Sequence, residues 1–283
     1  MNSLKTKSFS LSDTLGCGQS FCWTKEGKGY VTADLGQVVY VEQEGDQLRF
    51  ETSAGLPVDL TSLLGLNHPI ESIKRELATD DIMKESMAFA PGLRIVCDPF
   101  FTCLISFICS IWKNIPAIRL SMDKIRREWG PTYTYMGREY HGMPGPEVLS
   151  EATIEQLRGL GLGFRAKYIQ KTAEAVVERR VNADALRGMT FDEARADLKT
   201  LYGVGDKVAD CVCLFSLGFL EAFPIDVWIE RVIRDHYGIF AESGRAYAKK
   251  SKAARAYFGP YAGYAQEYLF HYARSRGEAS CPS

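Results

Sequence analysis

The amino-acid sequence predicts an α+β protein, in which an N-terminal antiparallel β domain (residues 1–100) precedes a larger, all-helical domain (residues 101–283). Three observations carry this prediction. Residues up to about 55 have the pattern of strands, the chain from about residue 100 has helical periodicity, and a helix, a glycine turn and a second helix follow one another at about residues 191–217. A chain of 283 residues, 46% of them hydrophobic, can bury one large core or two smaller ones.

The clearest strand signal lies in residues 36–50. Residues 36–41 read Gly-Gln-Val-Val-Tyr-Val and residues 47–50 read Gln-Leu-Arg-Phe, both containing the side chains that strands favour. The Gly45-Asp46 pair between them is typical of a tight turn. We therefore expect a β-hairpin within an antiparallel sheet.

Helical signals dominate the rest of the chain. Apolar residues recur at i, i+4, i+7 and i+8 on one expected buried helix face, formed by Ile169, Ala173, Val176 and Val177. Thr190, with Glu193 three residues later, fits a capping box that starts another helix, running to about Tyr202.

A glycine hairpin, Gly203-Val204-Gly205, follows that helix. The next helix carries apolar residues on one face and stops at Gly218. Glycines let the backbone approach a phosphate closely, and the free amides at the start of a helix point outward, so this unit would grip DNA without reading its sequence. An ordinary helix–turn–helix corner without a ligand is the competing interpretation.

Composition gives weaker indications. The net charge is −1, but residues 1–100 hold 9 Lys/Arg against 14 Asp/Glu (−5), whereas residues 101–283 hold 25 against 21 (+4). The N-terminus is polar, no apolar run approaches a membrane span, and none of the eight cysteines forms a Cys-x-x-Cys pair. We therefore expect an intracellular protein without a membrane segment, and we expect neither a zinc nor an iron–sulfur site.

Lys207 is the first candidate for chemistry. It falls within the first turn of the second helix, where the positive end of the helix dipole favours the neutral amine. A neutral amine can attack a sugar C1′, displace the base and form a Schiff base, after which the strand can be cut by β-elimination. A solvated lysine, or one that contacts a phosphate, is the alternative.

Asp226 is the second candidate. It precedes an apolar-periodic run, so it reads first as the N-cap of a helix. A carboxylate fixed at a helix start can also stabilise a developing oxocarbenium ion and move protons, so the two roles are compatible.

The combination of these features resembles the helix-hairpin-helix DNA glycosylase superfamily, and within it the 8-oxoguanine DNA glycosylase/AP lyase family. The segments that carry the resemblance are Leu201-Tyr202-Gly203-Val204-Gly205-Asp206-Lys207-Val208-Ala209-Asp210-Cys211 and Pro224-Ile225-Asp226-Val227. Monofunctional alkylpurine relatives lack the lysine. Further matches, in family order, lie at residues 18–21, 104–110, 161–166 and 260–266.

This resemblance implies a TBP-like N-terminal sheet joined to a helix-hairpin-helix glycosylase domain. It implies that Lys207 is the nucleophile and Asp226 the catalytic carboxylate. The amides around Gly203, Gly205 and Val208 would hold a DNA phosphate, next to a monovalent or divalent cation on hairpin carbonyls. No other cofactor or metal is implied, and the expected partner is double-stranded DNA that contains an oxidised purine.

The resemblance also assigns the residues that recognise the damaged base after it is flipped out of the duplex. The carbonyl of Gly18 would accept the N7 hydrogen of 8-oxoguanine, a donor that guanine lacks. Gln266 and Phe270, four residues apart on one helix face, would read the Watson–Crick edge and stack on the base. Cys211 and Phe215 would line the other side, although ordinary core packing explains Phe215 equally well.

The sequence departs from the family pattern where the opposite strand is read. Trp112 replaces the asparagine that fills the vacated space, Ala117 replaces one of two arginines that read the orphan cytosine, and Arg165 retains the other. Trp228 replaces a histidine that contacts a phosphate or the pocket. We therefore expect relaxed opposite-base discrimination. The alternative is that the bulky Trp112 acts as an apolar wedge that stacks in the gap.

The predicted function is excision of 8-oxoguanine by a bifunctional glycosylase/AP lyase that works as a DNA-associated monomer. Two alternatives stay open. One is a related glycosylase for formamidopyrimidine or alkylated purines, and the other is a noncatalytic helix-hairpin-helix module that only binds DNA.

Overall fold

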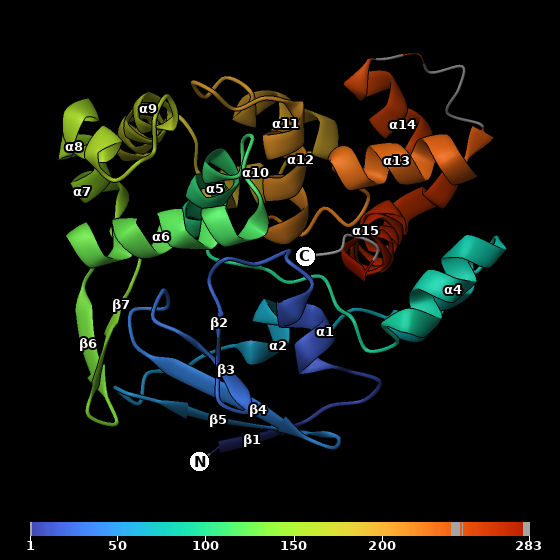
Figure 1. Cartoon of the computed structure of the whole chain (residues 1–283), viewed down its shortest axis with the longest axis horizontal. Helices are drawn as coiled ribbons and strands as arrows, with labels where there is room; N and C mark the ends of the chain where they lie inside the picture. Colours follow the sequence, from blue (N-terminus) through green and yellow to red (C-terminus); the bar gives the residue numbers. More distant parts are fainter. Residues whose placement is uncertain (1, 239–243, 245, 280–283) are drawn as a thin grey trace.

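The computed structural model describes residues 2–238, 244 and 246–279 and has the expected α+β architecture (Figure 1). One antiparallel sheet contains β1 (Asn2–Lys5), β2 (Thr24–Glu26), β3 (Gly29–Thr32), β4 (Val39–Glu44) and β5 (Gln47–Thr52), in the order β1-β5-β4-β3-β2. The predicted hairpin is confirmed as β4 and β5, with Glu44 paired to Gln47 around the Gly45-Asp46 turn.

Four helices complete the N-terminal region: α1 (Leu11–Gly16), α2 (Leu60–Leu63), α3 (Ile70–Leu77) and α4 (Asp81–Phe89). The helical region is formed by α5 (Phe100–Cys109), α6 (Ile115–Trp129), α7 (Pro146–Glu151), α8 (Ile154–Gly159), α9 (Arg165–Val177), α10 (Ala183–Arg187), α11 (Phe191–Leu198), α12 (Asp206–Phe215), α13 (Val227–His236), α14 (Tyr247–Phe258), the 3-10 turn η2 (Gly259–Tyr261) and α15 (Ala262–Ala279). In Figure 1 the sheet forms the lower part of the molecule and most of these helices lie above it.

One small hairpin interrupts the helical region, which the helical periodicity did not indicate. Strands β6 (Thr132–Tyr135) and β7 (Arg138–His141) follow α6 and reach back to the N-terminal sheet. The hydroxyl of Tyr135 donates to Glu51 at 2.5 Å, and that of Tyr140 donates to Glu26 at 2.8 Å. The hairpin therefore ties the two regions together.

The predicted helix–hairpin–helix unit is present in α11 and α12. The capping box is confirmed, since the Thr190 hydroxyl accepts from the Glu193 backbone N–H and the Glu193 carboxylate accepts from the Thr190 backbone N–H. Helix α11 ends at Leu198, four residues before the expected end, because residues 199–202 form tight turns instead. Gly203 has a φ of +87°, the left-handed conformation that the turn needs.

The core runs without a break across the expected domain boundary at residue 100. Phe21, from the loop after α1, packs edge-on against Phe107 of α5 with ring centroids 6.0 Å apart. The predicted buried face of α9 holds for Ile169 and Ala173, but Val177, at the end of the helix, is 43% exposed. The far end of the helical domain, residues 280–283, lies outside the described residues.

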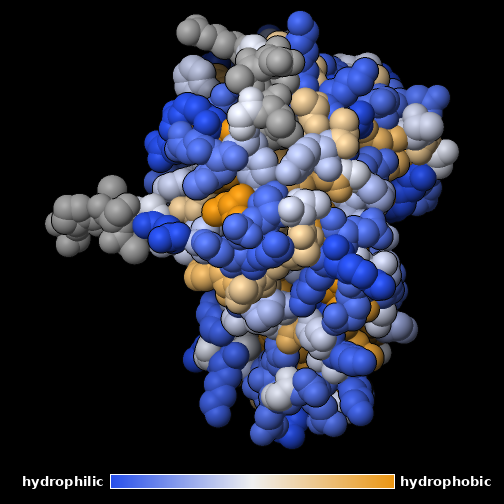
Figure 2. Space-filling view, turned by 90° about the vertical axis from the view of Figure 1, so that its right-hand side faces the viewer, coloured by the Kyte–Doolittle hydropathy of each residue, from blue (hydrophilic) through white to orange (hydrophobic). Residues whose placement is uncertain are grey.

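The surface on the side of α13, α14 and α4 is predominantly hydrophilic, with apolar residues in small groups (Figure 2). No helix in the described part of the chain is both long enough and apolar enough to span a membrane. Seven cysteines are described and all are free thiols, whereas Cys281 lies outside the described residues.

Replacing Gly203 by alanine should destabilise the hairpin. The left-handed backbone costs about 1–2 kcal/mol for a residue with a Cβ, and a Cβ at this position would collide with the ring of Tyr168. Gly205→Ala is the matched control, because its φ is −93° and nothing lies within 4 Å of an added Cβ. Chemical denaturation should show a clearly larger loss for Gly203→Ala, and equal losses would contradict this account of the turn.

Candidate active site

Lys207 is the second residue of α12, and its amine is held against α5. The Nζ atom donates to the Ser110 hydroxyl at 3.1 Å and lies 4.9 Å from the centroid of the Phe107 ring. Phe107 in turn stacks on Phe215, with centroids 5.5 Å apart and an interplanar angle of 18°. An aromatic pair thus forms the floor beneath the candidate nucleophile and restricts where its amine can point.

Asp226 is the N-cap of α13, as predicted. Its Oδ1 accepts from the backbone N–H groups of Trp228 at 3.0 Å and Ile229 at 2.9 Å. Burial raises the pKa of Asp226, while the Ile229 N–H and the positive charge of Lys207 act in the opposite direction. The structure therefore brings a capping carboxylate within electrostatic reach of the Lys207 amine.

A buried carboxylate fixes the relative placement of these two groups. Asp210, one turn after Lys207 on α12, is fully buried and accepts from Arg195 at 2.5 Å. Its other oxygen accepts from the Tyr247 hydroxyl at 2.8 Å, and that hydroxyl accepts the Ile225 N–H at 3.0 Å. The helix that carries Lys207 is thus connected through two side chains to the residue before Asp226.

The hairpin presents main-chain donors at the start of α12. Gly205 is the N-cap and provides no side-chain hydrogen bond to the first amides of the helix, which include those of Lys207 and Val208. Asp206 at the same turn is paired with Arg195 at 2.9 Å and with Lys199. Because these cations compensate its charge, the helix start remains suitable for an anion.

The predicted base-recognition residues come from both ends of the chain. Gly18 has a φ of +107°, and a Cβ on it would lie 2.6 Å from Ile115 Cδ1 and 3.8 Å from Phe270 Cε1. The left-handed backbone therefore favours glycine here, and a Cβ would in addition require the Ile115 side chain to shift. Gln266 is 4% exposed and its Oε1 has no hydrogen-bond partner among the described residues.

Cys211 and Phe215 are buried in α12. Burial raises the pKa of the Cys211 thiol to about 12, although the charge of nearby Lys207 acts in the opposite direction. Phe215 is 3% exposed and stacked on Phe107, so in this structure it supports the floor under Lys207. Contact of either side chain with a base stays a prediction.

A second buried carboxyl lies close to Asp226. Glu267, the neighbour of Gln266 on α15, is 1% exposed, and burial raises its pKa to about 7. The negative charge of Asp226 raises the pKa further, and the Cys17 thiol next to Gly18 acts in the opposite direction through a hydrogen bond. Glu267, the neighbour of Gln266, thus interacts electrostatically with Asp226 and with Cys17, the neighbour of Gly18.

The residues predicted to contact the opposite strand differ in their exposure to solvent. Trp112 is 91% exposed, whereas Arg165 is only 7% exposed. The Arg165 guanidinium donates to the main-chain carbonyls of Ile111 and Leu162, so its donors are turned inward rather than toward an open surface. The Trp228 ring packs against Gly277 of α15. The guanidinium carbon of Arg231 lies over this ring, 5.1 Å from the ring centroid.

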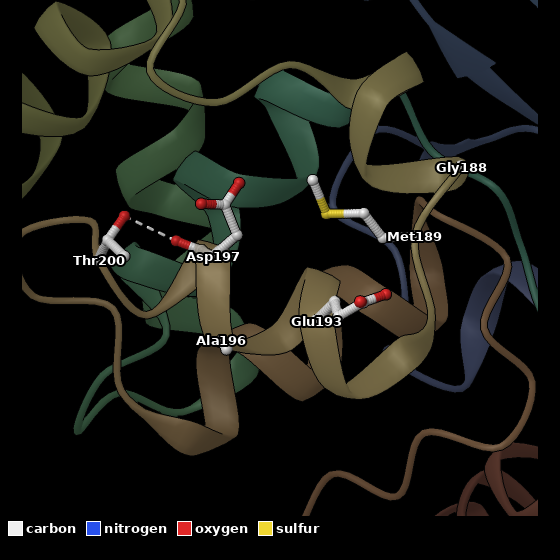
Figure 3. Close-up of a pocket in the computed structure, with 6 residues that line it drawn as sticks. All are labelled: Gly188, Met189, Glu193, Ala196, Asp197 and Thr200. Carbon is white, nitrogen blue, oxygen red and sulfur yellow. Dashed lines mark hydrogen bonds between the residues drawn. The ribbon is translucent and has the colours of Figure 1, made fainter.

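A separate hollow of about 550 Å³ lies against α11 (Figure 3). Its lining residues, Gly188, Met189, Glu193, Ala196, Asp197 and Thr200, include none of the candidate site residues. The Thr200 hydroxyl, shown in the figure, donates to the carbonyl of Asp197 in the last turn of α11 at 2.7 Å.

Four residues that shape this site were missed by sequence reasoning: Phe107, Ser110, Ile115 and Tyr247. Ser110 and Phe107 lie within the matched segment 104–110, but nothing local indicated that they face Lys207. Their contacts span 97 positions or more in sequence, and Tyr247 lies 37 positions from Asp210. Only tertiary packing brings these groups together.

Two family models cover most of the chain. The 8-oxoguanine DNA glycosylase, N-terminal domain model matches residues 3–104, and the HhH-GPD superfamily base excision DNA repair protein model matches residues 105–255. The fold is thus that of a base excision DNA repair protein with a helix-hairpin-helix unit. The chain belongs to the 8-oxoguanine DNA glycosylase/AP lyase family of that superfamily.

Individual relatives agree with this assignment. A probable N-glycosylase/DNA lyase of Methanothermobacter thermautotrophicus is 36% identical over 66% of this chain, although the match spans only 65% of that relative. The N-glycosylase/DNA lyase of Saccharomyces cerevisiae is 30% identical over 86% of this chain and 72% of its own length. The 8-oxoguanine glycosylase/lyase of Clostridium acetobutylicum, solved with double-stranded DNA containing cytosine opposite 8-oxoguanine, superposes with a TM-score of 0.88 at 30% identity, over 95% of this chain and 93% of that one.

Replacing Tyr247 by phenylalanine should weaken the connection between α12 and Asp226. The substitution leaves the Ile225 N–H without its acceptor and removes a donor from buried Asp210, which should cost about 1–3 kcal/mol in the free energy of unfolding. Tyr257→Phe is a suitable control, because this half-exposed hydroxyl makes only a 3.4 Å bond to Asp80. Similar losses in the two variants would show that the Asp210 network is not specially important.

Proposed function

We propose that this protein excises 8-oxoguanine from duplex DNA as a bifunctional glycosylase/AP lyase, with Lys207 as its nucleophile. The observation that carries the proposal is the placement of the Lys207 amine, which is fixed by Ser110 over Phe107 and lies within electrostatic reach of Asp226. Simple DNA binding would need neither the buried carboxylate nor the aromatic floor. The placement therefore favours catalysis over the noncatalytic DNA-binding alternative.

In the proposed reaction the Lys207 ammonium gives up a proton, and the resulting amine attacks C1′ of the flipped nucleotide. The bond from C1′ to the base breaks, and the base leaves with the electron pair and takes up a proton. Asp226 stabilises the positive charge that develops on the sugar. Opening of the sugar ring then gives a protonated Schiff base, loss of a C2′ proton expels the 3′ phosphate, and water releases the lysine.

Lesion selectivity would arise at Gly18. Its main-chain carbonyl would accept the N7 hydrogen of 8-oxoguanine, whereas N7 of guanine would place a second acceptor against it. Two buried acceptors face to face cost about 1–3 kcal/mol, so base flipping and closure of the site must add further selectivity. The left-handed backbone at Gly18 and the nearness of Phe270 support this role.

We further infer that the protein acts as a monomer, because one flipped nucleotide needs one pocket, and that it is associated with DNA inside the cell. The reaction needs no organic cofactor. The described residues contain no cluster of three or more His, Cys, Asp or Glu side chains that could hold a metal ion. The family resemblance implies that main-chain carbonyls of the hairpin would hold any cation there.

Borohydride trapping tests the nucleophile directly. On a duplex with a single 8-oxoguanine, the native chain should form a covalent adduct, because borohydride reduces the Schiff base, and Lys207→Gln should form none. Lys167→Gln, which removes an exposed lysine 4.9 Å from the Tyr202 ring, is the matched control and should still be trapped. Base release without trapping by the native chain would instead indicate a monofunctional glycosylase.

A panel of opposite bases tests discrimination. Ala117 lacks the donors of an arginine and Arg165 is committed to main-chain carbonyls, so a bidentate reader worth roughly 1–3 kcal/mol is missing. Excision rates opposite the four bases should therefore fall within roughly tenfold of one another. Ala117→Arg serves as the comparison variant and should increase the preference for cytosine. A strong cytosine preference of the native chain would contradict the prediction.

A further inference from the structure

The loop that carries Gly18 is tied to the segment that precedes α5 by two buried polar side chains. Gln19 and Ser20 directly follow Gly18 and are 2% and 1% exposed. The Gln19 amide donates to the main-chain carbonyl of Arg94 at 2.7 Å. The Ser20 hydroxyl donates to Oδ2 of Asp98, also at 2.7 Å. The loop is therefore held by interior hydrogen bonds rather than by surface contacts.

Asp98 has an unfavourable environment for a carboxylate. It is 3% exposed, and its Oδ1 has no hydrogen-bond partner among the described residues. Burial raises the pKa of Asp98 to about 7, although the hydrogen bond from Ser20 acts in the opposite direction. Arg126, the cation that acts on this carboxyl, is itself paired with Asp34. Since an unpaired buried oxygen costs free energy, a carboxyl kept at this position calls for an explanation beyond stability.

The main chain of Asp98 binds the end of α12. Its N–H donates to the carbonyl of Phe215 at 2.7 Å, and its carbonyl accepts from the Ser216 hydroxyl at 2.8 Å. Phe215 belongs to the aromatic floor beneath Lys207. Asp98 therefore contacts the loop of Gly18 through its side chain and the helix of Lys207 through its main chain.

We propose that Asp98 is a positioning residue for base recognition, which acts through Ser20 to fix the Gly18 carbonyl relative to the helix that carries Lys207. This inference rests on the proposed function, in which that carbonyl accepts the N7 hydrogen of the lesion. Gly18 lies two residues before Ser20, so their Cα atoms are at most about 7 Å apart and a shift of one displaces the other. A displacement of about 1 Å can slow a reaction about a hundredfold, because the bound base no longer meets its reacting partners correctly.

The nucleophile is held by a different set of contacts. The Lys207 amine is bound by Ser110, and its helix is fixed by the buried pairing of Asp210 with Arg195. Attack on the aldehyde of an abasic site needs this amine but no base, whereas excision of 8-oxoguanine also needs Gly18. Loosening the Gly18 loop should therefore impair excision and leave reaction with an abasic site intact.

Ser20→Ala tests the link, since it removes the hydroxyl and keeps every main-chain bond of Asp98. Two quantities are measured: the single-turnover excision rate on a duplex with 8-oxoguanine opposite cytosine, and borohydride trapping on a duplex with a natural abasic site. Ser20→Ala should slow excision roughly tenfold or more, because a hydrogen bond to a charged group is lost, with native trapping. Asp98→Asn offers the hydroxyl a neutral and weaker acceptor, so its excision rate should fall between those of the native chain and Ser20→Ala.

Ser86→Ala is the matched control. Ser86 is also fully buried, and its hydroxyl donates to the Ile82 carbonyl at the same distance of 2.7 Å, but within α4. This variant should match the native chain in both assays. Native excision by Ser20→Ala would overturn the proposal, and so would a loss of trapping as large as the loss of excision, which indicates a general structural defect. If the native chain itself neither excises 8-oxoguanine nor is trapped on the abasic duplex, the proposed function fails together with this inference.

Discussion

The placement of the reactive groups depends on one buried carboxylate. Asp210 has no exposed surface, and burial raises its pKa, while Arg195 acts in the opposite direction. A charge in this position is costly unless it is fully paired, and here Arg195, Tyr247 and Ser251 all donate to it. The same interactions hold α11, α12 and α14 together, so the geometry of the hairpin and of the site follows from satisfying a single buried charge.

The starts of α12 and α13 both contribute to this site, and they carry charges of opposite sign. Helix α12 begins with unused amides and carries Lys207 in its first turn, whereas α13 begins with a carboxylate that caps its own amides. The first arrangement suits an external anion and the second keeps a negative charge at a fixed point. The two helix starts thus have the charge distribution that the proposed reaction needs, for a DNA phosphate at α12 and for a cationic sugar beside Asp226.

The features that depend on residues close together in the sequence were predicted correctly. Contacts between segments far apart in the sequence were not predicted. The β4–β5 turn, the Thr190–Glu193 box and the Asp226 cap were all predictable, because each is decided within a few positions. Periodicity missed the early end of α11, where residues 199–202 form local turns, and the exposure of Val177, which is the last residue of α9. The inward orientation of Arg165 was equally hidden, since its acceptor on Ile111 is 54 positions away.

The residues predicted to recognise the base come from segments that lie far apart in the sequence. Gly18 belongs to the loop after α1, whereas Phe270 and Gln266 belong to α15. The hairpin that would grip phosphate is complete by residue 218. During synthesis on the ribosome, therefore, a nascent chain acquires the elements for holding DNA well before those for selecting a base. If Gln266 and Phe270 contact the base as proposed, base selection would need α15 to dock, whereas the hairpin needs only α11 and α12.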